Sequence, residues 1–366
     1  LMLAITALIT EFGRFMTENR NAEELVAATR RWGGRHGRTV SLIMMPAMIG
    51  LIPMPAGALF SAPFVEHAGR GMDKKAEWKS AVNYWFRHVL EFWWPLYPGA
   101  IIAMSLFEMD AWKFMTTQIF YTPVALLASY GFLVRSHWRS LVDEGVPPAG
   151  SNRRALFILL PLVIVMLALF LVPAVVDRLL PHAEAASRRM MAVLIGLLAG
   201  LVLIVADDLR RGEVRIFSSL LERRSVNVLI TLAAVLIFKS LLQRSGLLPL
   251  AGRELLAIGI PIVLAVALLP FLAGLLTGIA LGFTGVSFPL VVGLLASEEA
   301  GLTPSATLAL AYGFGYVGMM LSPMHLCLLV TKDYFSADLR RIYRAILPCV
   351  GVVAAFSVVL YTALRL

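Results

Sequence analysis

The sequence predicts an all-α polytopic membrane protein made of two inverted repeats, and three observations support this prediction. Of the 366 residues, 59% are hydrophobic and 15% are charged, with a mean hydropathy of +0.80, whereas soluble domains carry about 25% charged residues. The apolar residues form runs long enough to cross ~30 Å of hydrocarbon as helices. Helix breakers recur at similar places in both halves of the chain. Each repeat should therefore contain scaffold helices, a re-entrant helical hairpin and a broken transmembrane helix.

The apolar runs place the helices. Membrane-spanning helices are expected at roughly 112–133, 155–176, 191–206, 226–243 and 345–364. The runs 81–108 and 303–330 are interrupted by Pro and Gly, which predicts two broken helices. The runs 39–66 and 256–297 are broken near their middles, and we interpret them as the hairpins.

The loop charges decide how the hairpins cross. When both hairpins enter and leave on the same side, 23 of the 32 Lys and Arg residues lie on one face of the membrane and 5 on the other. The basic face then consists of 13–38, 66–80, 134–154, 207–225 and 331–344. Basic loops are typical of the cytoplasmic side. A single crossing by either hairpin would remove this asymmetry, so the charges favour re-entrant hairpins.

Three sequence blocks repeat in the same order. Pro-x3-Gly occurs at 46–50 and 270–274, Ser-x-Pro-x-Val at 61–65 and 287–291, and residues 84–95 align without gaps to 312–323. The displacements are 224, 226 and 228 residues. In the topology above the two copies have opposite orientations. Inverted repeats with discontinuous helices are typical of secondary transporters.

The repeat gives the domain organisation. In the first copy, residues 1–38 hold the remnant of a scaffold helix and an amphipathic arm (22–32), and residues 39–133 form the first transport-domain half. In the second copy, residues 155–258 hold scaffold helices and a second arm (247–258), and residues 259–366 form the second transport-domain half with its hairpin at 259–297. The alternative for both arms is a surface helix in the membrane interface. Since the second copy opens with three helices, we expect two further transmembrane helices before residue 1.

Two segments resemble a known family. PMPAGALFSAPFVE (53–66) and NYWFRHVLEFWWPLYPG (83–99) resemble an uncharacterised prokaryotic membrane family, domain of unknown function 401, and the whole pattern resembles the ion-transporter superfamily of elevator-type carriers. The resemblance implies hairpins and broken helices that move against a fixed scaffold, and a homodimer formed through scaffold helices. Sodium-coupled dicarboxylate carriers of that superfamily have Ser-Asn-Thr at both hairpin tips, whereas the first tip here (53–57) has neither Asn nor Thr.

The hairpin tips are expected to face a binding site, because irregular backbone in a membrane lies within protein or along a cavity. Half-helices starting near Ala58 and Val286 would direct N–H groups and positive dipole ends there, which favours an anion. The alternative is that Gly and Pro serve close helix packing. The expected substrate-binding residues in the tips are Pro55, Ala56, Gly57, Ser61, Thr284, Gly285 and Ser287.

The first broken helix holds the densest cluster of ionisable residues in an apolar run. Arg87 and Glu91 are four residues apart, and His88 and Glu91 three, so each pair shares a helix face. Arg87 could bind a substrate carboxylate, while His88 or Glu91 could carry a coupling proton. The alternative is an internal Arg–Glu pair with the histidine directed to the cytoplasmic end. Asn83 is a further polar candidate with the same alternative.

The second broken helix offers Ser322 as a substrate ligand and His325 as a coupling residue, on either side of Pro323. An unwound segment there would expose carbonyl groups to a cation or substrate. The alternative for His325 is a hydrogen-bonded packing residue.

These features predict a secondary active transporter for a small organic anion in a prokaryotic inner membrane, coupled to H⁺ or Na⁺. No cofactor, metal site or nucleic-acid partner is expected, and neither a disulfide nor a metal site follows from Cys327 and Cys349. Motifs for ATP binding and for the common hydrolases are absent from the sequence, so we expect no enzyme. The alternatives are an intramembrane enzyme that uses His88, Glu91 or His325, and a non-transporting receptor or assembly factor.

Overall fold

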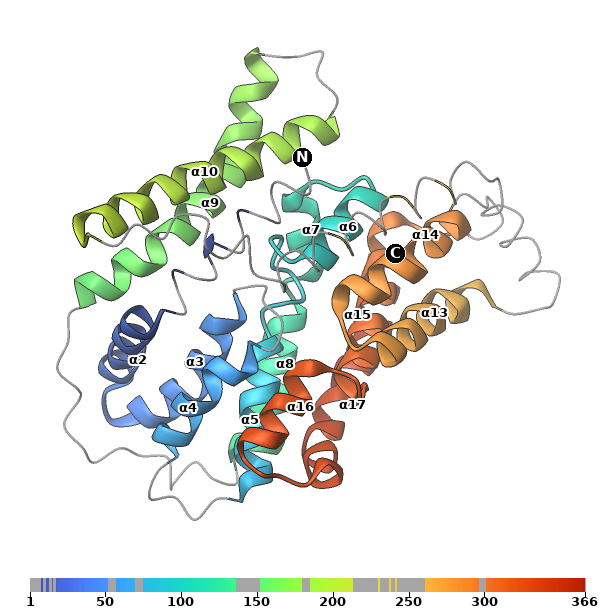
Figure 1. Cartoon of the computed structure of the whole chain (residues 1–366). Coiled ribbons are helices and arrows are strands. Elements are labelled where there is room, and N and C mark those ends of the chain that lie inside the picture. The colour runs from blue at the N-terminus through green and yellow to red at the C-terminus, as the bar shows by residue number, and fades with distance from the viewer. Residues whose placement is uncertain are drawn as a thin grey trace.

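The computed structural model describes residues 8, 11, 12, 15, 18–51, 57–69, 75–135, 152–179, 185–212, 230, 237, 241, 261–295 and 301–365. Every regular element within these ranges is a helix, which confirms the predicted all-α class (Figure 1). Three of the described helical segments are long and apolar enough to cross a membrane: Ala111–Val134, Pro304–Tyr334 and Leu339–Arg365. The chain is therefore a multi-pass membrane protein.

The first half of the chain follows the predicted order of elements. Its helices are α2 (Asn19–Gly33), η1 (Gly34–His36), α3 (Gly37–Gly50), α4 (Ala58–Ala68), α5 (Ala76–His88), α6 (Pro98–Leu106), α7 (Ala111–Gln118), α8 (Tyr121–Ser129) and the π-helical turn η2 (Tyr130–Val134). Helix α2 contains the arm expected at 22–32. The segments between α5 and α6 and between α7 and α8 are interruptions within long apolar runs.

The second half contains α9 (Asn152–Leu179), α10 (Ala185–Arg210), α13 (Ile262–Thr277), α14 (Ala280–Leu295), α15 (Pro304–Leu321), α16 (Leu326–Tyr334) and α17 (Leu339–Arg365). The helix expected at 155–176 is α9, the one at 191–206 is α10, and the one at 345–364 is α17. The helix expected at 226–243 and the second arm at 247–258 lie outside the described residues, apart from Ile230, Ile237 and Leu241.

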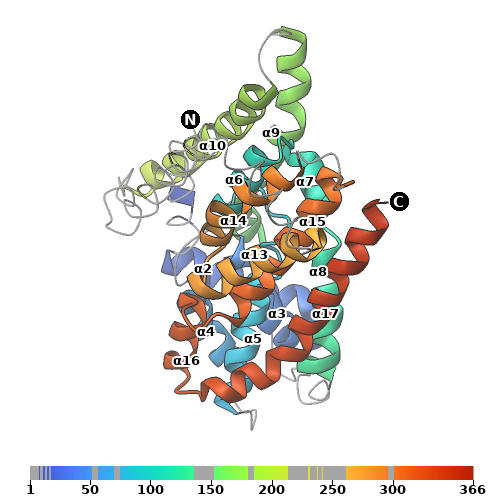
Figure 2. The same cartoon turned by 90° about the vertical axis from the view of Figure 1, so that its right-hand side faces the viewer.

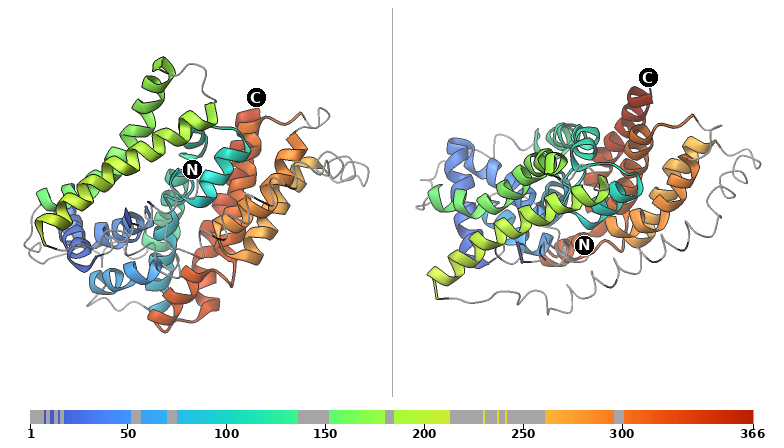
Figure 3. Two further views of the ribbon diagram at one scale, coloured as in Figure 1. Left: turned by 45° about the horizontal axis from the view of Figure 1, so that its top comes forward. Right: turned by 90° about the horizontal axis from the view of Figure 1, so that it is seen from above.

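Helices α9 and α10 pack against each other and stand apart from α13, α14 and α15 (Figures 1 and 3). Arg154 of α9 joins this pair to the arm. Its guanidinium donates to both carboxylate oxygens of Asp207 in α10 at 2.8 Å and to Oδ1 of Asn21 in α2 at 2.9 Å. The ion pair is partly buried, and the three helices thus share one polar anchor.

Each predicted hairpin is present as two helices that pack against each other, α3 with α4 and α13 with α14. The first hairpin continues into α4 at Ala58, as expected. The second hairpin turns at Gly278, which has φ +66° and whose N–H donates to Gly274 O at 2.8 Å. Only glycine adopts this left-handed conformation readily. The hairpin tip expected around 282–287 is therefore wrong, because Thr284, Gly285 and Ser287 lie inside α14, which starts at Ala280 and not near Val286.

The two broken helices end and restart as predicted. The first consists of α5 and α6, separated by residues 89–97, and the second of α15 and α16, separated by residues 322–325. Helices α5 and α15, α6 and α16, and α7 and α17 begin 228 residues apart in each case. This is the displacement of the third repeated sequence block, so the helix boundaries support the internal repeat.

The junction between α6 and α7 has the same backbone as the junction between α16 and α17. Glu108 (φ +54°) and Ser336 (φ +52°) are the non-glycine residues with positive φ in the described ranges. Two residues later, Asp110 and Asp338 cap α7 and α17, each accepting from the backbone N–H three residues on, at 2.6 and 3.0 Å. All these pairs again lie 228 residues apart, so the repeat extends to turn geometry.

Close helix contacts repeat as well. A Cβ on Gly50 of α3 would collide with the carbonyl oxygen of Arg87 in α5, and a Cβ on Gly274 of α13 would collide with that of Gly315 in α15. The copies also interlock, since α4 packs on α16 and α14 on α6. Helix α17 runs beside α8 (Figure 2). These contacts bring the break of each broken helix near the hairpin of the other copy.

Candidate functional site

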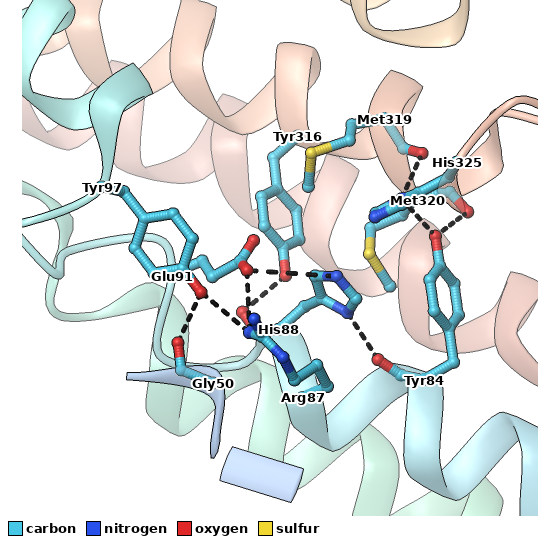
Figure 4. A network of polar contacts seen from close by, with 10 residues as sticks. All are labelled: Gly50, Tyr84, Arg87, His88, Glu91, Tyr97, Tyr316, Met319, Met320 and His325. Atoms are coloured by element: carbon cyan, nitrogen blue, oxygen red, sulfur yellow. Dashed lines mark hydrogen bonds and ion pairs between the residues drawn. The ribbon is translucent and has the colours of Figure 1, made fainter. Parts of the chain in front are cut away.

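Helix α5 carries a row of buried polar side chains toward α4 and toward the break between α15 and α16. Asn83, Tyr84, Arg87, His88 and Glu91 are each no more than 6% exposed. They recur every three or four residues, which places them along one side of α5 and the turn that follows it. Figure 4 shows His88 between two groups of partners, with Arg87, Glu91 and Tyr97 on one side and Tyr84 and His325 on the other.

Arg87 forms the centre of the first group. Its Nη1 donates to Glu91 Oε1 at 3.1 Å and to the hydroxyl of Tyr97 at 2.8 Å, and that hydroxyl donates to Gly50 O. Gly57 allows the guanidinium to reach the start of α4, because a Cβ there would lie 2.6 Å from Nη2. A buried positive charge and the N-terminus of a helix thus meet at one point.

His88 and His325 form the centre of the second group. His88 Nδ1 lies 2.6 Å from Tyr84 O, and His325 Nδ1 lies 3.1 Å from Met319 O and 2.8 Å from the Tyr84 hydroxyl. That hydroxyl donates to Met320 O at 3.0 Å. Because carbonyl oxygens only accept, we assign the proton of each neutral imidazole to Nδ1. The Nε2 atoms then carry the lone pairs, and the two ring centroids are 4.8 Å apart.

Asn83 connects three elements in a third group. Its amide donates to Ala58 O at 2.8 Å and to Thr331 Oγ1 at 3.1 Å, and its Oδ1 accepts from Ser61 Oγ at 2.6 Å. All four residues are completely buried. The amide thereby fixes the first turns of α4 between α5 and α16.

The structure brings together part of the expected site. Gly57, Ser61, Arg87, His88, Glu91 and His325 belong to the three connected groups. Pro55 and Ala56 lie outside the described residues. Ser322 is buried at the second break, where its hydroxyl accepts from Met324 N at 3.1 Å. Thr284 and Ser287 donate to carbonyls of their own helix, at 2.8 and 2.7 Å, and their contacts do not join these groups.

Sequence reasoning missed Tyr84, Tyr316 and Cys327. The Tyr84 hydroxyl bonds partners 236 and 241 residues away, and Tyr316 donates to His88 O at 2.6 Å from 228 residues away. Cys327 lies against the start of α4, where the N–H groups of Gly57 and Ala58 approach its sulfur. The aligned pair Tyr84 and Tyr312 was a usable signal, since a polar tip conserved between copies in apolar helices needs a partner.

The site is not symmetric between the copies. The positions that correspond to Arg87, His88 and Glu91 hold Gly315, Tyr316 and Met319. Among the described residues, the ionisable groups Arg87, His88 and Glu91 are therefore supplied by the first copy of the repeat and not by the second.

Comparison with known proteins gives a family and a fold. The model of the family described as "Protein of unknown function (DUF401)" matches residues 35–364. The crystal structure of the YdaH transporter from Alcanivorax borkumensis is similar in fold, with a TM-score of 0.50 and 14% sequence identity over 99% of this chain and 84% of that one. The comparison with curated proteins finds no match.

Proposed function

This chain belongs to the DUF401 family of proteins of unknown function, and from that premise we propose that it is a secondary active transporter for a small organic anion. The fold it shares with a transporter supports this class of function over an enzyme. The proposal includes an elevator mechanism in a prokaryotic inner membrane. Coupling is to protons or to a cation.

The observation that carries the proposal is the position of Arg87. Its guanidinium is 1% exposed and lies against Gly57, where the positive end of α4 also points. A buried guanidinium next to a helix N-terminus is a favourable place for a carboxylate, which it can bind through two parallel hydrogen bonds. Glu91, paired with Arg87 at 3.1 Å, is the group that an incoming anion would displace.

Coupling is assigned to His88, Glu91 and His325. Glu91 Oε1 lies 4.0 Å from His88 Nε2, and the His88 and His325 rings are neighbours. These side chains form a continuous row of proton-accepting groups from the Arg87 pair to the second break. Ionisable groups inside a membrane protein are typical of proton relays.

The elevator mechanism is supported by how the helices are grouped. The interlocked hairpins and broken helices form the moving part in this proposal, and α9 and α10 form the fixed scaffold. The arm α2 packs on both α3 and α9 and links the two parts. Exposed apolar residues on α9 and α10, among them Leu167, Leu171 and Val202, contact lipid or a second copy of the chain.

Uptake into proteoliposomes tests the proposal. Purified protein should accumulate at least one radiolabelled acid from a panel of mono-, di- and tricarboxylates under an inward proton or sodium gradient. Replacing the pair together, Arg87→Met with Glu91→Leu, should reduce uptake at least ~100-fold, because the acid loses two charge-assisted hydrogen bonds of about 1.5–3 kcal/mol each. Absence of gradient-dependent uptake for every acid of the panel would refute the carboxylate substrate.

A matched control is the ion pair between Arg341 and Glu77, 3.4 Å apart, whose arginine side chain is 63% exposed. The pair of substitutions Arg341→Met and Glu77→Leu removes one positive and one negative charge from a pair whose arginine faces solvent. Uptake by this variant should equal that of the wild type. An equal loss in both double variants would show that Arg87 has no special role.

The asymmetry of the cluster favours a second candidate, an intramembrane enzyme that uses His88, Glu91 or His325 for proton transfer. The two candidates differ in the fate of the solute. A transporter delivers it unchanged, so mass spectrometry of the vesicle interior should recover the intact acid. Recovery of a converted product would favour the enzyme.

A further inference from the structure

The three side chains His88, His325 and Cys327 form a buried cluster of metal-binding groups. One ligand atom from each, two imidazole nitrogens and the thiol sulfur, lie within 4.8 Å of one another. All three residues are buried, at 1%, 5% and 6% exposure. They come from both broken helices, since His88 ends α5 and the other two stand at the start of α16.

We propose that this cluster is a binding site for a borderline transition-metal ion of the Zn²⁺ type. Two imidazoles and one thiolate are a ligand set that zinc prefers, in contrast to the oxygen ligands of Mg²⁺ or Ca²⁺. The ligand atoms of a tetrahedral zinc site lie roughly 3.3–3.8 Å apart, so the three groups must approach by about 1 Å. The inference concerns binding and does not require that the chain transports an anion. While a metal occupies Nε2 of His88 and His325, Glu91 is the remaining coupling group of the proposed function.

The hydrogen bonds already orient both imidazoles for a metal. With Nδ1 of His88 donating to Tyr84 O, and Nδ1 of His325 placed between Met319 O and the Tyr84 hydroxyl, each ring presents the lone pair of Nε2. Metal-binding histidines typically donate their other ring N–H to a carbonyl oxygen in this way. In the described part of the chain, neither Nε2 has a hydrogen-bond partner within bonding distance, and the nearest carboxylate to His88 Nε2 is Glu91 at 4.0 Å.

The surroundings compensate the charges of a bound metal. Binding replaces the thiol proton of Cys327, which is released to solvent, and leaves a thiolate. The N–H groups of Gly57 and Ala58 at the start of α4 approach this sulfur, and the start of a helix stabilises a thiolate. The nearby positive charge of Arg87 is offset by Glu91.

The ligand positions are also where the two copies of the repeat differ. The residues 228 positions away from His88, His325 and Cys327 are Tyr316, Tyr97 and Gly99. Gly99 packs against Ala280 at the start of α14, as Cys327 does against the start of α4. The backbone arrangement is thus shared, while the metal-binding side chains occur on one side only.

Zinc competition with a chromophoric chelator tests the site on the purified full-length chain. The wild type should bind one Zn²⁺ per chain, and Cys327→Ser should weaken binding by at least ~100-fold, since even loss of an outer hydrogen-bond partner costs 10–100-fold. Cys349→Ser is the matched control, because Cys349 is also buried but lies in α17 outside the cluster. This variant should bind zinc like the wild type.

Tyr84→Phe tests the positioning role of the hydroxyl that contacts His325. It should weaken zinc binding about 10–100-fold while retaining the thiolate-to-metal absorption of the Co²⁺-loaded protein. Wild type and Cys349→Ser should show that absorption, and Cys327→Ser should not. Three results would each overturn the proposal: no stoichiometric zinc binding, unchanged binding in Cys327→Ser, or a wild-type Co²⁺ spectrum without the thiolate band. The wild-type spectrum needs no variant, so it tests the proposal even if Cys327→Ser does not fold.

Anion uptake is measured separately, in proteoliposomes treated with a chelator that removes bound metal. The failure of one proposal can then be distinguished from the failure of the other. Zinc binding without anion uptake would leave the metal site standing and refute the carboxylate carrier. Anion uptake without zinc binding would refute the metal site and leave the carboxylate carrier standing.

Discussion

At the scale of the residue, the site depends on buried polar groups that hold one another in place. Arg87 and Glu91 are an ion pair whose side chains are 1% and 8% exposed. Burial of charges costs several kcal/mol, so such a pair contributes little net stability, but removal of one partner leaves the other charge without compensation. In the proposed function the pair serves binding, and its net contribution to stability is expected to be small.

Glu91→Leu alone should destabilise the protein by about 3–5 kcal/mol, because it removes the carboxylate that compensates Arg87. The double variant Arg87→Met with Glu91→Leu should restore most of this loss. Thermal unfolding in detergent measures both. A single variant as stable as the double would contradict the assignment of Arg87 as a charge that Glu91 neutralises.

Asn83→Leu should cost about 1–3 kcal/mol, because Ala58 O, Ser61 and Thr331 each lose one hydrogen bond, and the remaining bond from Ser61 Oγ to Ala58 O is long at 3.2 Å. Thr116→Val is the control, since Thr116 is exposed and its hydroxyl bonds only its own helix. Equal unfolding temperatures for both variants would show that the amide has no structural role.

At the scale of the element, the sequence indicated where helices break, but only partly why. Pro and Gly clusters correctly predicted the two broken helices and the start of α4. The second tip was misplaced because glycine has two uses: Gly278 makes the turn with φ +66°, whereas Gly282 lies where a Cβ would collide with the Thr277 side chain. Periodicity does not separate turning from close packing. Partners such as Tyr84 and His325 are 241 residues apart, so no local pattern joins them.

The paired glycines Gly50 and Gly274 should respond alike to alanine. In each case the new methyl group meets a carbonyl oxygen of the packed broken helix, and overpacking typically costs 1–3 kcal/mol. Gly351→Ala, with no atom within 4 Å of the added Cβ in α17, is the control and should be neutral or slightly stabilising. Tolerance of alanine at only one of the two positions would argue against equivalent packing in the copies.

At the scale of the whole molecule, two copies of one helical unit bring their helix breaks together around a cluster of buried polar side chains. The sequence revealed the repeat through three short blocks, and the structure extends it to helix starts, capping aspartates and positive-φ turns. The shared Phe-x-x-Asp at 107–110 and 335–338 is a sequence signal that marks this turn. The opposite orientation of the copies stays a prediction from the loop charges.

The most direct test of that orientation replaces Glu108 and Ser336 singly by cysteine and labels each variant with a membrane-impermeant maleimide. Both residues are exposed at the tips of equivalent turns, and the native cysteines are buried, so the unmodified protein gives the background. With two inverted copies, Glu108→Cys should react from outside intact cells and Ser336→Cys only from the cytoplasmic side. Reaction of both variants from the same side would contradict the inverted repeat.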